Sequence, residues 1–103
     1  MTQLILIDPT TKTIEFVERK DKTLKSLYEL ADCEYFESMR ITPSLVLLID
    51  EEAKLRNKQQ EQFMIDNQIA ILGKGILCRD GNEGDNIDVT DADLEYAKQL
   101  FTF

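Results

Sequence analysis

The longest uninterrupted apolar run in this chain of 103 residues is Leu45–Ile49. A run this short cannot span a membrane, because crossing the hydrocarbon core takes about 20 apolar residues. It is instead typical of a strand that is covered on both faces, where no side chain has to meet water. Pro43 precedes the run and the acidic turn Asp50–Glu52 follows it. The sequence therefore predicts a central strand of a sheet at this position.

Several other short segments have the composition of strands, with β-branched, aromatic and aliphatic residues between turn formers. They are Leu4–Ile7, Thr13–Val17, Glu34–Ile41, Ile69–Leu72, Gly75–Cys78 and Ile87–Val89. Asp8–Pro9 favours a turn, so the first two segments are expected to form a hairpin. In the third segment the apolar side chains share one side at a period of two, and Glu37 is the exception. The apolar members of this series are Cys33, Tyr35, Met39 and Ile41.

Two stretches between these strands are less regular. Gly73–Gly75 is too short for a phosphate-binding loop and predicts a bend or a bulge. Residues 57–66 are mostly polar, with Phe63–Ile65 embedded among them. This pattern leaves open whether the stretch is a short helix or an irregular segment.

Two segments have helical periodicity. The first can be capped by Asp21 or Thr23, and Thr90 caps the second with Asp93 at the N3 position of a capping box. Their apolar faces are Leu24, Leu27, Tyr28 and Ala31 in the first, and Leu94, Ala97, Leu100 and Phe101 in the second. The expected fold is a single α+β domain over residues 1–103. It has a small mixed or antiparallel sheet of about five to six strands, one helix in the N-terminal half and one C-terminal helix.

Histidine is absent from the chain, which excludes several kinds of chemistry. There can be no Ser-His-Asp triad, no Cys-His pair and no His-ligated zinc. Cys33 and Cys78 stand far apart and are expected to be reduced thiols in or near the core. The first residues, Met1–Asp8, have no basic region and are not a signal peptide, so a cytoplasmic protein is expected. No metal or cofactor is expected either.

The acidic residues are concentrated near the C-terminus. The formal net charge is −8, and most of it comes from residues 80–95, called here the acidic segment, which contain no Lys or Arg. Its acidic residues are Asp80, Glu83, Asp85, Asp88, Asp91, Asp93 and Glu95. Turn and helix-terminus chemistry alone accounts for many of them. They also form a candidate surface for a basic protein partner, since charge of one sign steers association.

Three other kinds of partner are considered from the same residues. The loop that begins at Asp80 departs from the calcium-binding pattern, because it has Gly84 at the fifth position and Asp85 at the sixth. Direct binding to nucleic acid is not expected of a chain with this net charge. A homodimer stays open, because two-fold dimers are the commonest closed assemblies.

Asp50, Glu51 and Glu52 carry the alternative hypothesis. Three carboxylates at the end of a strand are compatible with a small-molecule or nucleotide-binding domain that has weak hydrolytic activity. Three consecutive acidic residues in a turn more often simply face water. The sequence therefore favours a non-enzymatic protein and keeps the binding domain as the alternative.

Three segments resemble a family of small bacterial, phage and plasmid proteins catalogued as a domain of unknown function. They are Leu47–Asn57, Ile71–Leu77 and Val89–Leu94. The resemblance implies an extended N-terminal pair, a short helix, further strands and a terminal helix. It also implies an origin in a prophage or mobile element and a host protein as partner, but it assigns no catalytic residues.

Overall fold

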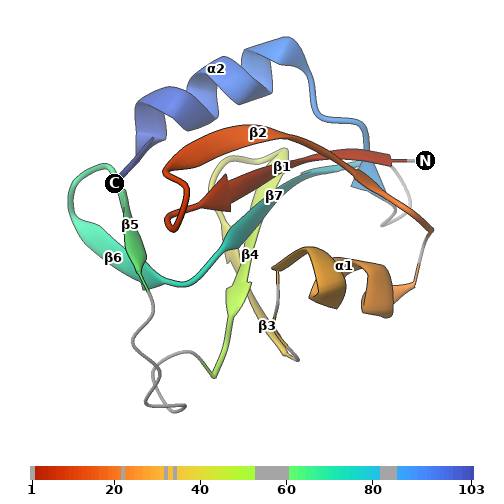
Figure 1. The fold of residues 1–103 in the computed structure, drawn as a ribbon. Coiled ribbons are helices and arrows are strands. Elements are labelled where there is room, and N and C mark those ends of the chain that lie inside the picture. Colours follow the sequence, from red (N-terminus) through yellow and green to blue (C-terminus); the bar gives the residue numbers. More distant parts are fainter. Residues whose placement is uncertain (1, 22, 32, 34, 53–60, 82–85) are drawn as a thin grey trace.

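The computed structural model describes residues 2–21, 23–31, 33, 35–52, 61–81 and 86–103 (Figure 1). These residues form a main sheet, a smaller second sheet and two helices. The strands are β1 (Thr2–Asp8), β2 (Thr13–Arg19), β3 (Phe36–Arg40), β4 (Leu45–Asp50), β5 (Gln62–Ile65), β6 (Ile69–Leu72), β7 (Gly75–Asp80), β8 (Asn86–Ile87) and β9 (Phe101–Thr102). The helices are α1 (Leu24–Ala31) and α2 (Asp91–Leu100).

The main sheet has the strand order β2-β1-β7-β4-β3, and β8 extends it beside β7. Every strand pair in the described sheets is antiparallel, which settles the choice between a mixed and an antiparallel sheet. The predicted hairpin of β1 and β2 is confirmed, and Asp8 Oδ1 accepts a hydrogen bond from Thr10 N at 3.0 Å in its turn. The predicted strand at Leu45–Ile49 is an interior strand, with β7 on one side and β3 on the other.

The main sheet is covered on both faces, one by each helix (Figure 1). Because side chains alternate along a strand, neighbouring residues enter different hydrophobic clusters. Leu4 and Ile76 pack on the side of α1, whereas Ile5 and Leu77 pack on the side of α2. Both predicted helices are confirmed, and Thr23 caps the first, since its Oγ1 accepts a hydrogen bond from Ser26 N at 3.4 Å.

The second sheet has the order β6-β5-β9 and packs on the α2 side. β5 lies in the stretch that the sequence left undecided, and it is a strand because Phe63 and Ile65 alternate into the core. Residues 57–60 lie outside the described residues. The prediction that Phe101 continues the helical stripe is wrong. α2 ends at Leu100, and Phe101 is extended and pairs with Ile65.

Two glycines shape the junction between the sheets. Gly73 has a φ of 83° and makes the predicted bend between β6 and β7. Gly75 is a regularly paired residue of β7 and not part of a bulge. A Cβ atom at Gly75 would lie 2.8 Å from the ring of Phe63. The second sheet therefore approaches the main sheet as closely as it does because residue 75 has no side chain.

The alternation predicted around β3 is only partly observed. Met39 and Ile41 pack on the α2 side, but Cys33 belongs to the cluster under α1. Cys33 precedes β3, so the period of two does not extend to it. Tyr35 also precedes the strand and is 53% exposed.

Candidate functional site

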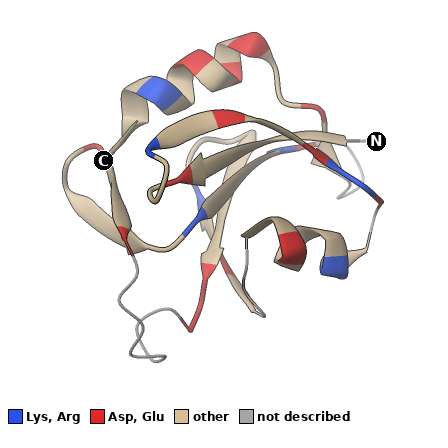
Figure 2. Cartoon of the chain, viewed as in Figure 1, with Lys and Arg blue, Asp and Glu red and all other residues tan. Residues whose placement is uncertain are grey.

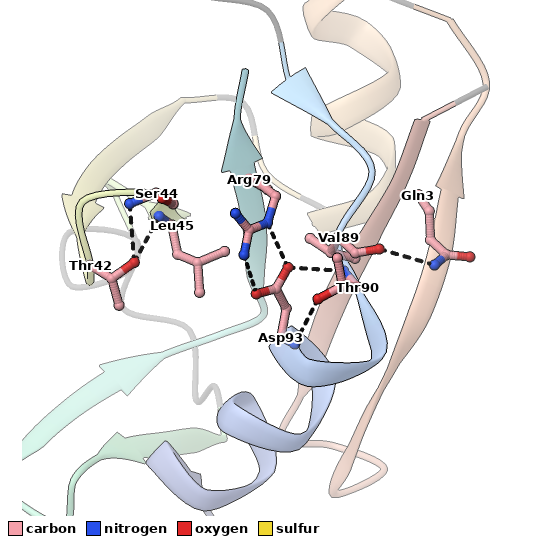
Figure 3. Close-up of polar contacts among 8 residues, drawn as sticks. All are labelled: Gln3, Thr42, Ser44, Leu45, Arg79, Val89, Thr90 and Asp93. Carbon is pink, nitrogen blue, oxygen red and sulfur yellow. Dashed lines mark hydrogen bonds and ion pairs between the residues drawn. The ribbon is translucent and has the colours of Figure 1, made fainter. Parts of the chain in front are cut away.

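Asp93 is part of the protein interior and not of an acidic surface. The residue is 4% exposed, and the guanidinium of Arg79 donates to its two carboxylate oxygens at 2.8 and 2.7 Å (Figure 3). Thr90 N donates to Asp93 Oδ2 at 2.9 Å, and Asp93 N donates to Thr90 Oγ1 at 3.1 Å, which completes the predicted capping box. The hydrogen bonds from Arg79 hold the pKa of the Asp93 carboxyl below its usual value, although burial acts in the opposite direction. The carboxylate of Asp93 is therefore engaged within the chain and exposes little surface to a partner.

Two more carboxylates of the acidic segment are engaged within the chain. Asp80 forms an ion pair with Arg40 at 2.8 Å. Asp88 Oδ1 accepts a hydrogen bond from Gln3 N at 2.8 Å, beside the hydrogen bond from Val89 N to Gln3 O at 3.1 Å. Figure 3 draws a second hydrogen bond between these two residues, in which Gln3 Nε2 donates to Val89 O at 3.4 Å. These bonds tie the acidic segment to β1 and to the β3–β4 hairpin.

The other members of the predicted surface fall into two groups. Glu83 and Asp85 lie outside the described residues. Asp91 and Glu95 are exposed on the first turns of α2, where acidic residues are visible along the helix in Figure 2. The position of Asp91 is also favoured by the dipole of the helix. Within the described residues, Asp88, Asp91 and Glu95 are exposed and Asp80 is partly exposed, and the binding surface itself stays a prediction.

A cleft of about 250 Å³ lies where the two sheets meet, between the β3–β4 end of the main sheet and β6 of the second sheet. It is called the inter-sheet cleft below. Its lining residues are Glu37, Met39, Ile49, Asp50, Glu51 and Ile69–Leu72. Ile49 and Ile71 are buried and form its floor, whereas Glu37, Glu51 and Ile69 are exposed at its rim. The cleft is therefore apolar inside and acidic at the entrance.

The consecutive carboxylates Asp50, Glu51 and Glu52 do not converge. Asp50 is paired in register with Phe36, which packs on the α1 side, and its Oδ1 accepts a hydrogen bond from Glu52 N at 2.9 Å. Glu51 continues the ladder, because its N–H donates to Tyr35 O at 3.1 Å. Since successive side chains of a strand point to opposite faces, the side chains of Glu51 and Asp50 leave the strand on opposite sides, although both residues contribute to the lining of the cleft. This geometry disfavours a joint hydrolytic role for the three residues.

Glu37 is the residue that joins Glu51 at the cleft. It is paired in register with Ile49, which belongs to the α2-side core, so its side chain is on the cleft side. Glu37 and Glu51 are both exposed, and no Lys or Arg is among the described residues that line the cleft. The sequence signal for this site was the break that Glu37 makes in the apolar series of its segment.

Two large apolar side chains are exposed next to these carboxylates. Tyr35 is 53% exposed and is hydrogen-bonded through its backbone to Glu51. Ile69 is 49% exposed and lines the cleft from β6. Exposed apolar groups beside a polar rim are typical of surfaces that bind another molecule.

The thiols of the chain are not positioned for chemistry at the surface. Cys33 and Cys78 are both buried. Burial raises the pKa of the Cys78 thiol to about 12, so it stays protonated at neutral pH and is a poor nucleophile. Within the part of the chain that the structure describes, no group of three His, Cys, Asp or Glu residues is placed to hold a metal ion. Neither described helix is long and apolar enough to cross a membrane.

A comparison with protein families identifies the chain at the level of its family. A family model described as "Domain of unknown function (DUF3846)" matches residues 1–102. The chain belongs to this family. Neither a curated protein nor a solved structure matches the chain significantly. The resemblance to a domain of unknown function is confirmed, and membership in DUF3846 assigns no activity, so the functional residues are argued from the geometry above.

Proposed function

We propose that this protein is a non-enzymatic binding domain that recognises a basic segment of another protein at the inter-sheet cleft. The observation that supports it is the combination of an apolar floor with an acidic rim. Glu37 and Glu51 provide the negative charge, and Ile49 and Ile71 provide the apolar surface. A lysine or arginine side chain matches this arrangement, because its aliphatic stem can lie on apolar surface while its charge meets a carboxylate.

The size of the cleft favours a protein segment over a small molecule. Its volume of about 250 Å³ lies below the range of about 300–1,000 Å³ that encloses most of a drug-sized ligand. The flanking Tyr35 and Ile69 extend the apolar surface beyond the cleft itself. A partner that covers all of these groups makes a larger contact than a ligand held in the cleft alone.

The acidic segment has a different role in this proposal. Asp91 and Glu95 add to the negative field of the molecule and steer a basic partner toward it, which raises the association rate. The resemblance to phage and plasmid proteins supports the further proposal that the protein is an accessory of a mobile element and that the partner is a host protein.

The test is a selection of binders from a displayed library of random short peptides. The wild-type protein is compared with two variants that each lose two negative charges. One is Glu37→Gln with Glu51→Gln at the cleft, and the other is Asp91→Asn with Glu95→Gln on α2. We expect all three forms to keep the same fold, because the substituted side chains are exposed.

We expect the wild type and the α2 variant to enrich peptides that combine Lys or Arg with apolar residues, and the cleft variant to lose these binders. Loss of binding in the α2 variant alone would assign the site to the acidic segment and overturn the proposal. The proposal would also be overturned if the wild type enriched no peptides beyond those that the cleft variant enriches. The salt dependence of binding to the selected peptides measures the electrostatic contribution separately.

A further inference from the structure

The inter-sheet cleft lies between two strands that each end a sheet. β3 is the last strand in the order β2-β1-β7-β4-β3, and β6 is the first in the order β6-β5-β9. In the described part of the chain, each of them therefore has one neighbouring strand. Residues of both strands line the cleft. A strand that ends a sheet presents backbone N–H and C=O groups that can pair with another chain.

The hydrogen bonds between β3 and β4 show which backbone groups point outward. Ile41 N donates to Leu45 O at 2.9 Å, and Glu51 N donates to Tyr35 O at 3.1 Å. In an antiparallel ladder the bonded pairs alternate with non-bonded pairs. The odd-numbered residues from 35 to 41 therefore bond to β4, and the backbone groups of Phe36, Ser38 and Arg40 point away from it.

The edge of β3 lacks the strongest of the features that natural edges use against pairing, although the strand is short and carries the charged residues Glu37 and Arg40. It contains no Pro and no Lys, which are common blocking residues. Its basic side chain, Arg40, is held by Asp80 at 2.8 Å and donates to Pro43 O at 3.2 Å. The guanidinium is therefore engaged with the β3–β4 hairpin and with β7.

We propose that a basic, extended segment of the partner adds to the free edge of β3 as a further strand and fills the inter-sheet cleft. This inference rests on the proposed function and specifies how the partner binds. Backbone hydrogen bonds to Phe36, Ser38 and Arg40 supply the affinity, and alternate side chains supply the specificity.

The register of β3 specifies the sequence pattern of the added strand. Tyr35, Glu37 and Met39 are at alternate positions, and Glu37 and Met39 face the cleft side. Cross-strand neighbours on one face of a sheet contact each other directly. The segment is therefore expected to carry an apolar residue, a Lys or Arg, and another apolar residue at positions i, i+2 and i+4, with the basic residue opposite Glu37.

The test uses peptides selected from the displayed library and the variant Ser38→Pro. Ser38 N points outward, so proline removes a donor of the free edge and no bond of the β3–β4 ladder, and edge positions tolerate proline. Ser38→Ala is the matched control, because it keeps the N–H. We expect about tenfold weaker peptide binding to Ser38→Pro and unchanged binding to Ser38→Ala.

A second measurement does not depend on the folding of a variant. The selected peptides are synthesised with N-methyl groups on alternate amides, in the two possible phases. Strand addition predicts that one phase abolishes binding to the wild type and that the other has little effect. Equal tolerance of both phases, or selected peptides with apolar residues at helical spacing, would overturn the inference.

The two proposals fail in different ways. If the Glu37→Gln/Glu51→Gln variant keeps binding, the proposed function itself is wrong. If that variant loses binding while Ser38→Pro and both methylated peptides bind normally, the cleft is the site but strand addition is wrong. Analytical ultracentrifugation of the free protein tests whether a second copy of this chain binds to the edge of β3 instead. A dimer that Ser38→Pro abolishes would assign the edge to that second copy and overturn the inference.

Discussion

The acidic segment and the inter-sheet cleft both carry carboxylates, but these groups are used differently. In the acidic segment, Asp80, Asp88 and Asp93 accept hydrogen bonds or form ion pairs within the chain. At the cleft, Glu37 and Glu51 are exposed beside apolar surface. The difference shows that the density of acidic residues in a sequence does not reveal how many of their carboxylates are engaged within the chain. A site requires charge that is available to a partner and lies next to uncovered apolar surface.

The strongest test of this comparison is the variant Asp93→Ala. It removes the partner of Arg79 and the capping box of α2, so we expect the free energy of unfolding to fall by about 2–3 kcal/mol. Asp91→Ala on the same helical turn is the control and is expected to cost less than about 1 kcal/mol. Urea unfolding of both variants measures the difference. Equal losses would mean that the Arg79–Asp93 pair contributes little to stability.

The close approach of the second sheet to the main sheet, beside the cleft, is tested by Gly75→Ala. The added methyl group meets the ring of Phe63 at 2.8 Å, so the second sheet has to move and the free energy of unfolding is expected to fall by about 2 kcal/mol. Combination with Phe63→Leu, which removes part of the ring, is expected to give a loss smaller than the sum of the two single losses. Strict additivity in this double-mutant cycle would contradict the close contact between residue 75 and Phe63.

The pH dependence of stability separates Asp93 from the exposed carboxylates. The pKa of Asp93 is lowered in the folded protein, mainly by its hydrogen bonds from Arg79. Its contribution is therefore present above the pKa of an unfolded Asp, about 3.9, and is lost as the pH falls through the lower folded-state value. Between about pH 5 and pH 2, the wild type should lose more stability than Asp93→Asn. If the free energy of unfolding changed with pH in the same way for the wild type and Asp93→Asn, Asp93 would not be the source of the pH dependence.

The smallest expected effect concerns Asp80. Its ion pair with Arg40 joins side chains that are 38% and 55% exposed, respectively. Exposed pairs of this kind contribute about 0–1 kcal/mol, so Asp80→Asn should change the free energy of unfolding by less than about 0.5 kcal/mol. Thermal unfolding at low and high salt measures it. A loss as large as that of Asp93→Ala would place Asp80 among the structural carboxylates.

Most secondary structure could be predicted because it follows from local patterns. The hairpin of β1 and β2, the interior strand β4 and both helices are encoded by apolar period, turn residues and caps. The sequence does not decide β5, because Phe63–Ile65 is a run of three apolar residues in a polar stretch, and the burial of Phe63 depends on Gly75 and Phe101. The spacing of Phe101 fits the apolar face of the helix, so the local pattern predicts a helical residue. Its ring instead packs edge-to-face on Phe63, with 5.5 Å between the ring centroids, and this contact depends on the tertiary structure.

The sites were harder to predict, because each is assembled from distant parts of the chain. The N3 position of Asp93 follows from the local pattern, but its salt bridge joins α2 to Arg79 of β7, which is distant in the sequence. Glu37 was visible as an exception in an apolar series. Its association with Glu51 and Ile69 depends on where the second sheet packs.

The sequence by itself determined the α+β class, the positions of the main strands and helices, and the exclusion of histidine chemistry, because each of these depends on residues close together in the chain. The tertiary structure alone decided which carboxylates form ion pairs or hydrogen bonds within the chain, and which strands end the two sheets in the described part of the chain. The physical reason is that ion pairs and strand neighbours form between residues far apart in sequence. Their formation depends on the packing of the two sheets and not on any local pattern.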